Sequence, residues 1–224
     1  MPVYALTDKL IFPDPKLASE EGLLAVGGDL SSERLIMAYS QGIFPWFSEG
    51  DPIMWWSPDP RMVLFPDKFR LYKSLKQTLH NKAYTIKFDS AFEEVIQACR
   101  AIERSGQDGT WITEEMEQAY INLHRLGYAH SVETYYKDKL AGGLYGISIG
   151  KAFFGESMFC YQKDASKIAL YTLVQKLTEW NFHFIDAQVE TDHLKSLGAE
   201  VIPRKKFLSL LQEALNYPTI KGKW

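Results

Sequence analysis

Three consecutive segments in the middle of the chain have the pattern of β-strands, and they constrain the fold more than any other feature. Residues 131–136, 140–149 and 152–159 read SVETYY, LAGGLYGISI and AFFGESMF. Period-two segments rich in β-branched and aromatic residues are typical of strands. The connections at Lys137-Asp138 and Gly150-Lys151 have the length of hairpin turns. We therefore expect an antiparallel meander at the centre of the protein.

Helical periodicity precedes the meander. Ser90-Ala91-Phe92-Glu93 matches a capping box, which predicts a helix from there to about Arg104. Thr113 is the predicted N-cap of a second helix, because Glu114-Glu115 follow in its first turn. Gly127 is the predicted end of that helix.

A long helix, one more strand and a last helix follow the meander. Asp164 is the predicted N-cap of the helix ASKIALYTLVQKLTEW, and NFHFIDAQV is the predicted strand after it. A short helical turn that ends at Gly198 and a helix from about Arg204 to Leu215 complete the pattern. The order α-α-β-β-β-α-β-α predicts an α+β fold.

The first 65 residues differ from the rest, because proline and glycine punctuate them. Only SSERLIMAYSQG has the pattern of a helix, with Ser31 as its N-cap and Gly42 as its stop. We expect loops and short strands around it. We therefore interpret residues 1–62 as a small N-terminal domain and residues 63–224 as a second domain.

Composition and charge exclude several classes of protein. The formal net charge of −3 argues against a protein that is basic over its whole surface, although a local basic patch stays compatible with it. Cys99 and Cys160 are too few for a disulfide framework and lack zinc-site spacing. The first residues do not resemble a secretory leader, and no apolar run reaches membrane-spanning length. We expect a cytoplasmic protein with no membrane partner.

Two of the predicted strands carry an acidic residue among apolar neighbours. Asp186 lies in FIDAQV, where alternation places it on one face with Gln188 and Phe184. Glu156 lies in FFGESMF, on a face shared with Phe154 and Met158. An ionised carboxylate inside a sheet needs hydrogen bonds or a cationic partner.

The two acids have two interpretations. If their strands are neighbours, Glu156, Asp186 and Gln188 converge on one pocket and form a functional site. The same residues also fit a buried polar network that holds loops, with Arg61 or Lys167 neutralising an acid. Perturbed carboxylates occur in both settings, so both interpretations stay open.

Tryptophan and histidine residues are further site candidates. Trp46, Trp55-Trp56 and Trp111 stand beside Gly, Pro or Ser in loop-like contexts. Core filling explains each of them singly, whereas an aromatic-lined ligand pocket explains them together. The histidines have no metal-ligand spacing and are interpreted as structural: His124, His130 and His193.

Basic residues gather in two runs, and several common motifs are missing. The runs contain Lys68, Arg70, Lys73, Lys76 and Lys82, and then Arg204, Lys205 and Lys206. Such runs are typical of a solvated face, and they also suit local phosphate contacts. The sequence has no Gly-rich phosphate loop, no G-x-S-x-G elbow and no metal-binding run, so we expect neither a metal nor a cofactor.

An ordered set of short blocks along nearly the whole chain resembles the leucyl/phenylalanyl-tRNA–protein transferase family. The blocks are GLLAVGGDLSSERLIMAYSQGIFPWF, WWSPDPR, GTWIT, AHSVE, GGLYG, FFGESMF, DASKIAL, IDAQ and HLKSLGA. The resemblance implies a GNAT-like acyltransferase domain after a small N-terminal domain. It also implies transfer of Leu or Phe, and Met less readily, from Leu-tRNA or Phe-tRNA to proteins that begin with Arg or Lys. The product would enter the N-degron degradation pathway.

The resemblance also assigns site residues. Its catalytic acidic and amide residues fall on Glu156, Asp186 and Gln188. Its aminoacyl pocket corresponds to Trp46, Trp111, Leu144, Phe153, Met158 and Ile185. Leu144 stands where we expect Met, a conservative change that adjusts pocket size. Simple alternation puts Phe153 on the face opposite to Met158, so its place in the pocket requires Gly155 to bend the strand.

One departure from GNAT enzymes concerns the acyl donor. Those enzymes bind the pyrophosphate of coenzyme A at a glycine-rich turn before the long helix, but residues 162–167 read QKDASK. We therefore expect an RNA-borne ester as donor. An acyl-CoA-dependent N-acyltransferase is the second hypothesis, and a non-catalytic adaptor that recognises N-terminal Arg or Lys is the third.

A mechanism follows as a hypothesis. Asp186 and Gln188 orient the acceptor's α-amine and assist loss of its proton, and the amine attacks the ester carbonyl. Glu156 positions the α-ammonium of the donor or of the acceptor. Which group takes the proton stays open, because an amide such as Gln188 is no base. We expect the enzyme to be a monomer.

Overall fold

The predicted meander forms the centre of a seven-stranded sheet. In the computed structural model, which describes residues 3–81, 84–102 and 111–224, the sheet order is β11-β5-β10-β9-β8-β7-β6. The meander consists of β7 (Ala129–Tyr136), β8 (Lys139–Ile149) and β9 (Ala152–Cys160), each antiparallel to the next. Both residues of its first turn, Lys137 and Asp138, have positive φ, which gives the two-residue turn a twist that matches its strands. The meander prediction is confirmed.

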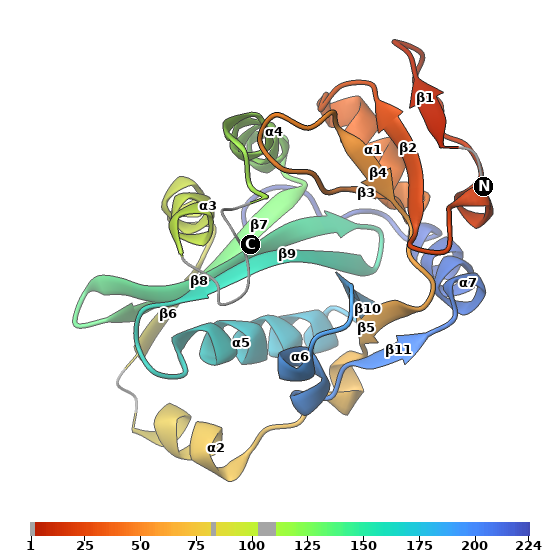
Figure 1. Ribbon diagram of the computed structural model, residues 1–224. Helices are drawn as coiled ribbons and strands as arrows, with labels where there is room; N and C mark the ends of the chain where they lie inside the picture. The colour runs from red at the N-terminus through yellow and green to blue at the C-terminus, as the bar shows by residue number, and fades with distance from the viewer. Residues whose placement is uncertain (1–2, 82–83, 103–110) are drawn as a thin grey trace.

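A crossover helix joins the meander to the other half of the sheet (Figure 1). Helix α5 (Ala165–Glu179) leads from β9 to β10 (Phe184–Gln188), and β10 pairs parallel to β9. Strand β5 (Arg61–Leu64) pairs antiparallel with β10 and with β11 (Glu200–Ile202). The meander–helix–strand order expected of a GNAT-like domain is therefore present.

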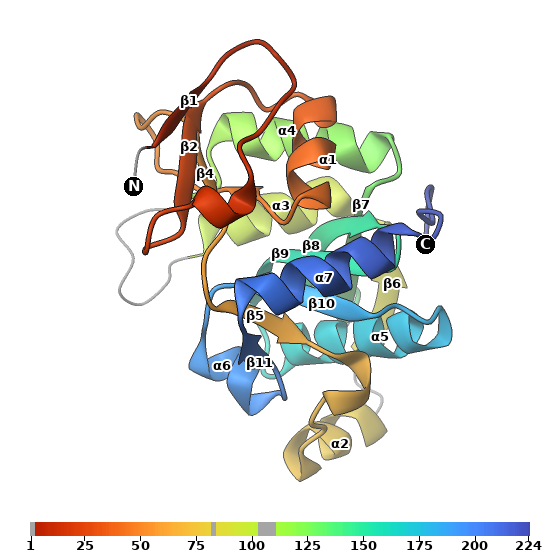
Figure 2. The same cartoon turned by 90° about the vertical axis from the view of Figure 1, so that its right-hand side faces the viewer.

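Helices cover both faces of this sheet, which makes it the middle layer. Helix α5 packs on one face against β7, β8 and β9. The opposite face is covered by α3 (Phe92–Ala101), α4 (Glu114–Arg125), α1 (Ser32–Ser40) and α7 (Arg204–Leu215), and Figures 1 and 2 show the two layers from two sides. Helices α2 (Lys73–His80) and α6 (Asp192–Ser196) lie on the same side of the sheet as α5 (Figure 1). Strand β6 (Tyr84–Phe88) is the edge strand of the sheet, beside β7.

The first part of the chain forms a separate small sheet. Its order is β1-β2-β4-β3, with β1 (Tyr4–Leu6), β2 (Leu23–Gly27), β3 (Phe44–Pro45) and β4 (Met54–Trp56). Short 3-10 turns lie at Pro15–Leu17 and Pro66–Lys68. Strand β5 belongs wholly to the larger sheet, so the division expected between residues 62 and 63 falls within a strand.

Two predicted helix caps are wrong, although their helices exist. The residue before α3 is Ala91, which makes no side-chain cap, because the Ser90 hydroxyl donates to the carboxylate of Glu133 instead. Glu133 also accepts from the N–H groups of Ser90 and Ala91, so a strand residue caps this helix. Asp164 has φ 63° and makes no cap bond; its carboxylate accepts from Thr78 at 3.1 Å. The expected end of α3 at Arg104 lies outside the described residues.

Thr113, by contrast, caps α4 as predicted, because its hydroxyl accepts from the N–H of Met116 at 3.2 Å. Helices α1, α4, α5 and α7 agree with their predicted segments to within a few residues. Within the described part of the chain, no helix has the length and apolar character needed to cross a lipid bilayer.

Candidate active site

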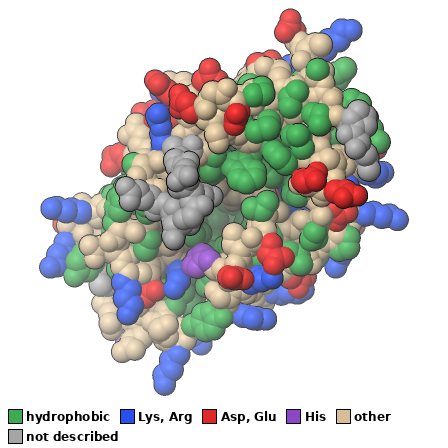
Figure 3. Space-filling model, in the orientation of Figure 1, with side chains coloured by type: hydrophobic (Ala, Val, Ile, Leu, Met, Phe, Trp, Pro, Cys, Tyr) green, Lys and Arg blue, Asp and Glu red, His purple; other side chains and the backbone are tan. Residues whose placement is uncertain are grey.

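A cavity opens where β9 and β10 stop pairing. The parallel pairing joins Phe184–Asp186 to Ala152–Phe154 and ends there. Beyond this point lies a cavity of about 510 Å³, a size typical of small-molecule sites. Figure 3 shows hydrophobic side chains gathered around a hollow on this face of the molecule. The cavity therefore lies at the point where the two strands separate.

A β-bulge at Glu156 shapes one side of the cavity. Tyr145 pairs with Ser157 and Gly146 pairs with Gly155, so Glu156 has no partner on β8. The bulge reverses the alternation along β9. Phe153 and Met158 consequently belong to the same side of the sheet, as part of the apolar cluster under α5.

The prediction that Glu156, Phe154 and Met158 share one face is therefore wrong for Met158, whereas Phe154 and Glu156 both contact Tyr39 of α1. Phe154 packs in the cluster on the opposite side of the sheet from Met158. Gly146 makes room for the bulged strand, because a Cβ there would lie 2.2 Å from the carbonyl oxygen of Phe154 and 2.5 Å from the ring of Phe153. Phe153 thus reaches the cavity through the irregularity at Gly155 and Glu156, where simple alternation excludes it.

The structure brings together all six residues assigned to the aminoacyl pocket. They are Trp46, Trp111, Leu144, Phe153, Met158 and Ile185, and each lines the cavity. The remaining apolar lining includes Phe44 and Pro45 of β3 and Leu170 and Leu173 of α5. Trp46 is 39% exposed and stands at the rim, with its ring edge-to-face on Trp56 at 5.9 Å between centroids. Most of the wall can accept an apolar side chain.

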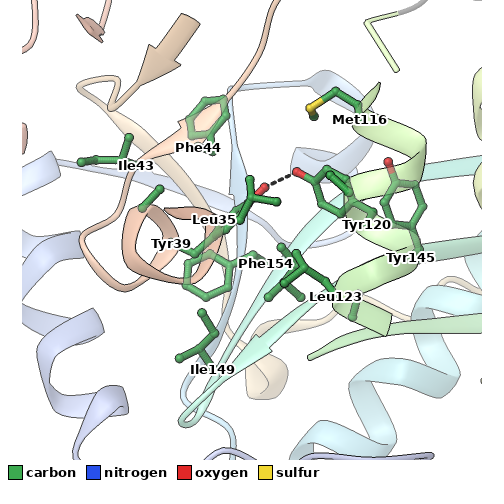
Figure 4. Packing of buried hydrophobic residues seen from close by; sticks show 14 of the residues in the cluster. Leu35, Tyr39, Ile43, Phe44, Met116, Tyr120, Leu123, Tyr145, Ile149 and Phe154 are labelled. Atoms are coloured by element: carbon green, nitrogen blue, oxygen red, sulfur yellow. Dashed lines mark hydrogen bonds between the residues drawn. The ribbon is translucent and has the colours of Figure 1, made fainter. Parts of the chain in front are cut away.

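Glu156 supplies a polar end to this apolar space. It is half-buried, and its carboxylate oxygens accept from two tyrosine hydroxyls, Tyr39 at 2.8 Å and Tyr120 at 2.9 Å. Burial raises the pKa of Glu156 to about 7, and the two tyrosine hydrogen bonds oppose that shift. Figure 4 shows Tyr39 on α1 and Tyr120 on α4 reaching toward each other.

Gln188 lies beside Glu156 because of a bulge in β10, and not because of the regular alternation of side chains along the strand. The pairing of β10 with β5 shifts between Asp186 and Gln188, and Gln188 has φ 54°. This bulge turns Gln188 into the cavity lining, where its amide nitrogen lies 3.4 Å from Glu156 Oε1. The prediction that Asp186 and Gln188 share a face is wrong.

Asp186 is the one predicted site residue that does not line the cavity. Its carboxylate is fully buried and forms a two-fold pair with Arg61, at 2.8 Å from Nε and 2.7 Å from Nη2. It also accepts from the backbone N–H of Gln188 at 3.0 Å. Asp186 therefore belongs to a buried polar network with Arg61, which was one of the two interpretations of the acids. Glu156 and Gln188 line the cavity, as the other interpretation expects.

The remaining candidates have separate places. Trp55 is buried in the core, where its indole donates to the carbonyl of Gly27. His193 lines the cavity, and burial lowers its pKa, with Lys167 adding to the effect. His130 is buried and hydrogen-bonded to Asp89 at 2.9 Å, as a structural role implies. Within residues 3–81, 84–102 and 111–224, no three His, Cys, Asp or Glu side chains gather as metal ligands would.

Tyr39 and Tyr120 are the site residues that the sequence did not reveal. Both lie on the buried faces of helices, where a tyrosine has the same pattern as any apolar residue. Their hydroxyls meet a carboxylate 117 and 36 positions away along the chain. Only the packing of α1 and α4 on the sheet and on each other brings these groups together.

The family models and the relatives that match this chain carry the same family description. A family model described as leucyl/phenylalanyl-tRNA protein transferase matches residues 63–212, and a model of that family's N-terminal domain matches residues 28–59. The chain is 55% identical to the leucyl/phenylalanyl-tRNA–protein transferase of Desulfatibacillum aliphaticivorans, covering all of this chain and 96% of that one. It is 54% identical to that of Myxococcus xanthus strain DK1622, covering all of this chain and 97% of the other.

A solved structure is also similar, though more distantly. An aminoglycoside acetyltransferase from an uncultured soil metagenomic sample aligns with a TM-score of 0.38 and 15% identity, over 52% of this chain and 85% of the other.

Proposed function

The chain belongs to the leucyl/phenylalanyl-tRNA protein transferase family, and we propose that it transfers Leu or Phe, and Met less readily, from aminoacyl-tRNA to the N-terminal Arg or Lys of a protein. The membership rests on two family models and on relatives more than half identical over the whole chain. The product carries a new N-terminal residue that marks it for N-degron degradation. A cytoplasmic, monomeric enzyme is part of the same proposal.

One observation carries the substrate assignment: the cavity joins a long apolar wall to a single polar corner. An aminoacyl group needs both, because its side chain is apolar whereas its α-ammonium and ester are polar. Trp46, Trp111 and Met158 line the apolar part, and Glu156 and Gln188 lie at the polar corner. A cavity of about 510 Å³ has room for a leucyl or phenylalanyl group together with an acceptor's amino end.

The proposed reaction requires that the amine and the ester are positioned next to each other and that the amine loses a proton. An aminoacyl ester is already activated, so the reaction as proposed requires neither ATP nor a metal. Its nucleophile is an α-amine with a pKa of roughly 7.7–8.0, which is mostly protonated at neutral pH. Alignment of amine and ester in one cavity supplies the first requirement.

Asp186 takes a changed part in this proposal. Because both of its carboxylate oxygens face Arg61, we assign contact with the amine to Gln188 and Glu156. Asp186 instead positions Gln188, by accepting its backbone N–H where β10 turns out of the sheet. Arg61 is held in turn between the rings of Phe44 and Phe207, at 4.7 and 4.5 Å from their centroids. The pair thus supports the strand end that carries the site.

Selection among donors follows from the shape of the wall. Removal of a methylene costs an apolar pocket only about 1–3 kcal/mol, so discrimination between Leu and Val is modest. Isoleucine is excluded by a clash at its β-branch. Leu144 and Ile185 face the space that a donor side chain would fill, so they set its width.

The start of α5 counts against coenzyme A as the donor. Asp164 occupies the position before the helix, and its carboxylate has only 11% exposed side-chain surface. This carboxylate accepts from Thr78 and pairs with Lys167 at 3.5 Å, so an acidic side chain with its own partners occupies the turn at which GNAT enzymes bind the pyrophosphate. Titration of the protein with acetyl-CoA in a calorimeter tests the point, and micromolar binding would favour an acyl-CoA-dependent enzyme.

A panel of acceptor peptides tests the specificity. Peptides that begin with Arg, Lys, Glu or Ala and are otherwise identical are mixed with Phe-tRNA and the protein. We expect the Arg and Lys peptides alone to gain a phenylalanyl residue. Binding of these peptides without turnover would support the adaptor hypothesis, and equal transfer to all four would contradict the acceptor specificity.

A further inference from the structure

Three oxygen-bearing side chains close into a ring at the polar corner. Tyr39 donates to one oxygen of Glu156 and Tyr120 donates to the other, at 2.8 and 2.9 Å. The two tyrosine hydroxyls also contact each other, as the dashed line in Figure 4 shows. Both tyrosine side chains are fully buried, so water does not compete for these contacts. Each member of the ring therefore touches the other two.

The number of protons in this ring depends on the charge of Glu156. Three oxygen–oxygen contacts need three protons if each is to be a hydrogen bond. With Glu156 ionised the ring holds two, one on each phenol, and the contact between the phenols or one contact to the carboxylate lacks a proton. With Glu156 protonated the ring holds three. Glu156 can thus gain a proton and keep its contacts with both tyrosines. When Glu156 is ionised, the two tyrosine hydroxyls still donate hydrogen bonds to it.

We propose that Glu156 takes the proton which the acceptor's α-ammonium must lose before it attacks the ester, and that Tyr39 and Tyr120 are positioning residues that fit Glu156 for this step. The inference rests on the proposed function, because it assumes an amine acceptor in this cavity. In the step, an N–H bond breaks and its electron pair stays on nitrogen, while an O–H bond forms on Glu156. The neutral amine then attacks the carbonyl carbon and forms the C–N bond. As the C–O bond breaks, the tRNA's 3′-oxygen leaves with its bonding electrons and takes up the second proton that the nitrogen loses, which gives an amide and a free 3′-hydroxyl.

The surroundings of Glu156 match its proton affinity to that of an amine. Burial raises the pKa of Glu156 to about 7, the tyrosine hydrogen bonds and the charge of Arg61 lower it, and the charge of Asp186 raises it. Because Asp186 and Arg61 are paired with each other, their effects largely offset. An α-ammonium with a pKa of roughly 7.7–8.0 can therefore pass its proton to Glu156 at little cost.

Other groups near the corner suit this step less well. Gln188 is an amide and cannot hold the proton, and the carboxylate of Asp186 is turned away into its pair with Arg61. Tyr145 of β8 packs edge-to-face on Tyr120, and burial and the charge of Glu156 raise the pKa of Tyr39 and of Tyr120, so the phenols stay protonated. His193 lines the same cavity and is the competing base.

The dependence of kcat/KM for an Arg peptide on pH tests the proposal, measured from pH 5.5 to 8.5 with Phe-tRNA as donor. If Glu156 accepts the proton, ionised Glu156 and protonated amine react together, so the profile is bell-shaped, with a fall below about pH 7 and another above the amine's pKa. If no protein group accepts it, only free amine reacts, and the profile rises through the amine's pKa and levels off.

Three variants and a control make the test specific. Glu156→Gln should lower kcat/KM about 10²–10⁴-fold and leave only the rise at the amine's pKa. Tyr39→Phe and Tyr120→Phe each remove a donor to the carboxylate, so the acidic limb should move to higher pH. Tyr84→Phe removes a hydroxyl that donates to the carbonyl of Lys163, away from the cavity, and should leave the profile unchanged.

The outcomes separate this inference from the function. Absence of any peptide product with the unaltered protein would overturn the proposed function itself. Transfer with a profile that only rises would overturn the role of Glu156 alone, and so would an acidic limb that persists in Glu156→Gln and disappears in His193→Gln. If circular dichroism shows that Glu156→Gln does not fold, the tyrosine variants test the proposal instead: the acidic limb of the pH profile should move to higher pH in Tyr39→Phe or Tyr120→Phe. A uniform loss of rate with an unmoved limb would show that the tyrosines are merely structural.

Discussion

Arg61 and Asp186 form a fully buried, two-fold ion pair between neighbouring strands, with nitrogen–oxygen distances of 2.8 and 2.7 Å. Arg61 is the first residue of β5, and Asp186 is the last residue of β10 before the bulge that leads to Gln188. The pair therefore fixes the point where the sheet opens into the cavity.

Removal of the Asp186 carboxylate should destabilise the protein as well as inactivate it. Asp186→Ala leaves a buried guanidinium without its counter-charge, which costs about 3–5 kcal/mol. We expect urea denaturation to show a loss of that size, and kcat to fall strongly in the fraction that stays folded. Asp186→Asn keeps hydrogen-bond acceptance toward Arg61 and should be less destabilised. An unchanged kcat in Asp186→Ala would remove Asp186 from the catalytic account.

Glu156 should reduce the stability of the fold at neutral pH. Its pKa is raised from 4.5 to about 7, so the folded state holds this proton more tightly than the unfolded state. Stability from this group is present below pH 4.5 and is lost as the pH rises through about 7. Glu156→Gln should therefore gain stability relative to the unaltered protein between pH 5 and pH 8, by up to roughly 3 kcal/mol.

Urea denaturation of both proteins at pH 5 and pH 8 measures this difference. Glu94→Gln, on the exposed surface of α3, is the matched control and should show no comparable change. A stability difference between Glu156→Gln and the unaltered protein that is equal at the two pH values would contradict burial of an acid with a raised pKa.

Trp46 and Trp111 should matter for the donor more than for the acceptor. Both line the apolar part of the cavity, so Trp46→Ala and Trp111→Ala should raise the donor KM severalfold or more and leave the acceptor KM less affected. Tyr161→Ala removes an aromatic ring that is 54% exposed outside the cavity lining and serves as the control. An unchanged donor KM in both tryptophan variants would show that the pocket assignment is wrong.

Transfer should weaken as salt rises, because a tRNA donor brings phosphates to the protein. Lys73 and Lys76 on α2 are exposed, as are Lys205 and Lys206 at the start of α7. We expect log(kcat/KM) for Phe-tRNA to fall linearly with log[salt] between 50 and 200 mM, and double lysine-to-alanine variants at whichever run contacts tRNA to make the slope shallower. A rate that is independent of salt would argue against phosphate contacts altogether.

The regular elements could be predicted from the sequence wherever a pattern spans a whole strand or helix. The meander, α4, α5 and α7 each have long apolar periodicity and clear stop residues. Strand β5 has no such pattern, because Arg61 resembles a loop residue after Pro58 and Pro60, and its partner Asp186 is 125 positions away. Edge strand β6 is short and only partly buried, so its pattern is weak.

The site could be predicted as a set of residues but not as an arrangement. Alternation is reversed at Glu156 and at Gln188, where bulges insert a residue, and no local pattern specifies either bulge. For this reason the predicted faces of Met158 and Gln188 are wrong, whereas the pocket residues still come together. The hydroxyls of Tyr39 and Tyr120 meet the carboxylate of Glu156 only when helices from distant parts of the chain pack on the sheet.

The most direct measurement is transfer itself. Purified protein is mixed with tRNA charged with radiolabelled phenylalanine and a peptide that begins with Arg, and the peptide is examined by mass spectrometry and by scintillation counting. The account predicts a peptide heavier by one phenylalanyl residue, labelled at its N-terminus and formed without ATP, metal or coenzyme A. A peptide that stays unlabelled, while the protein is folded and the tRNA remains charged, would contradict it.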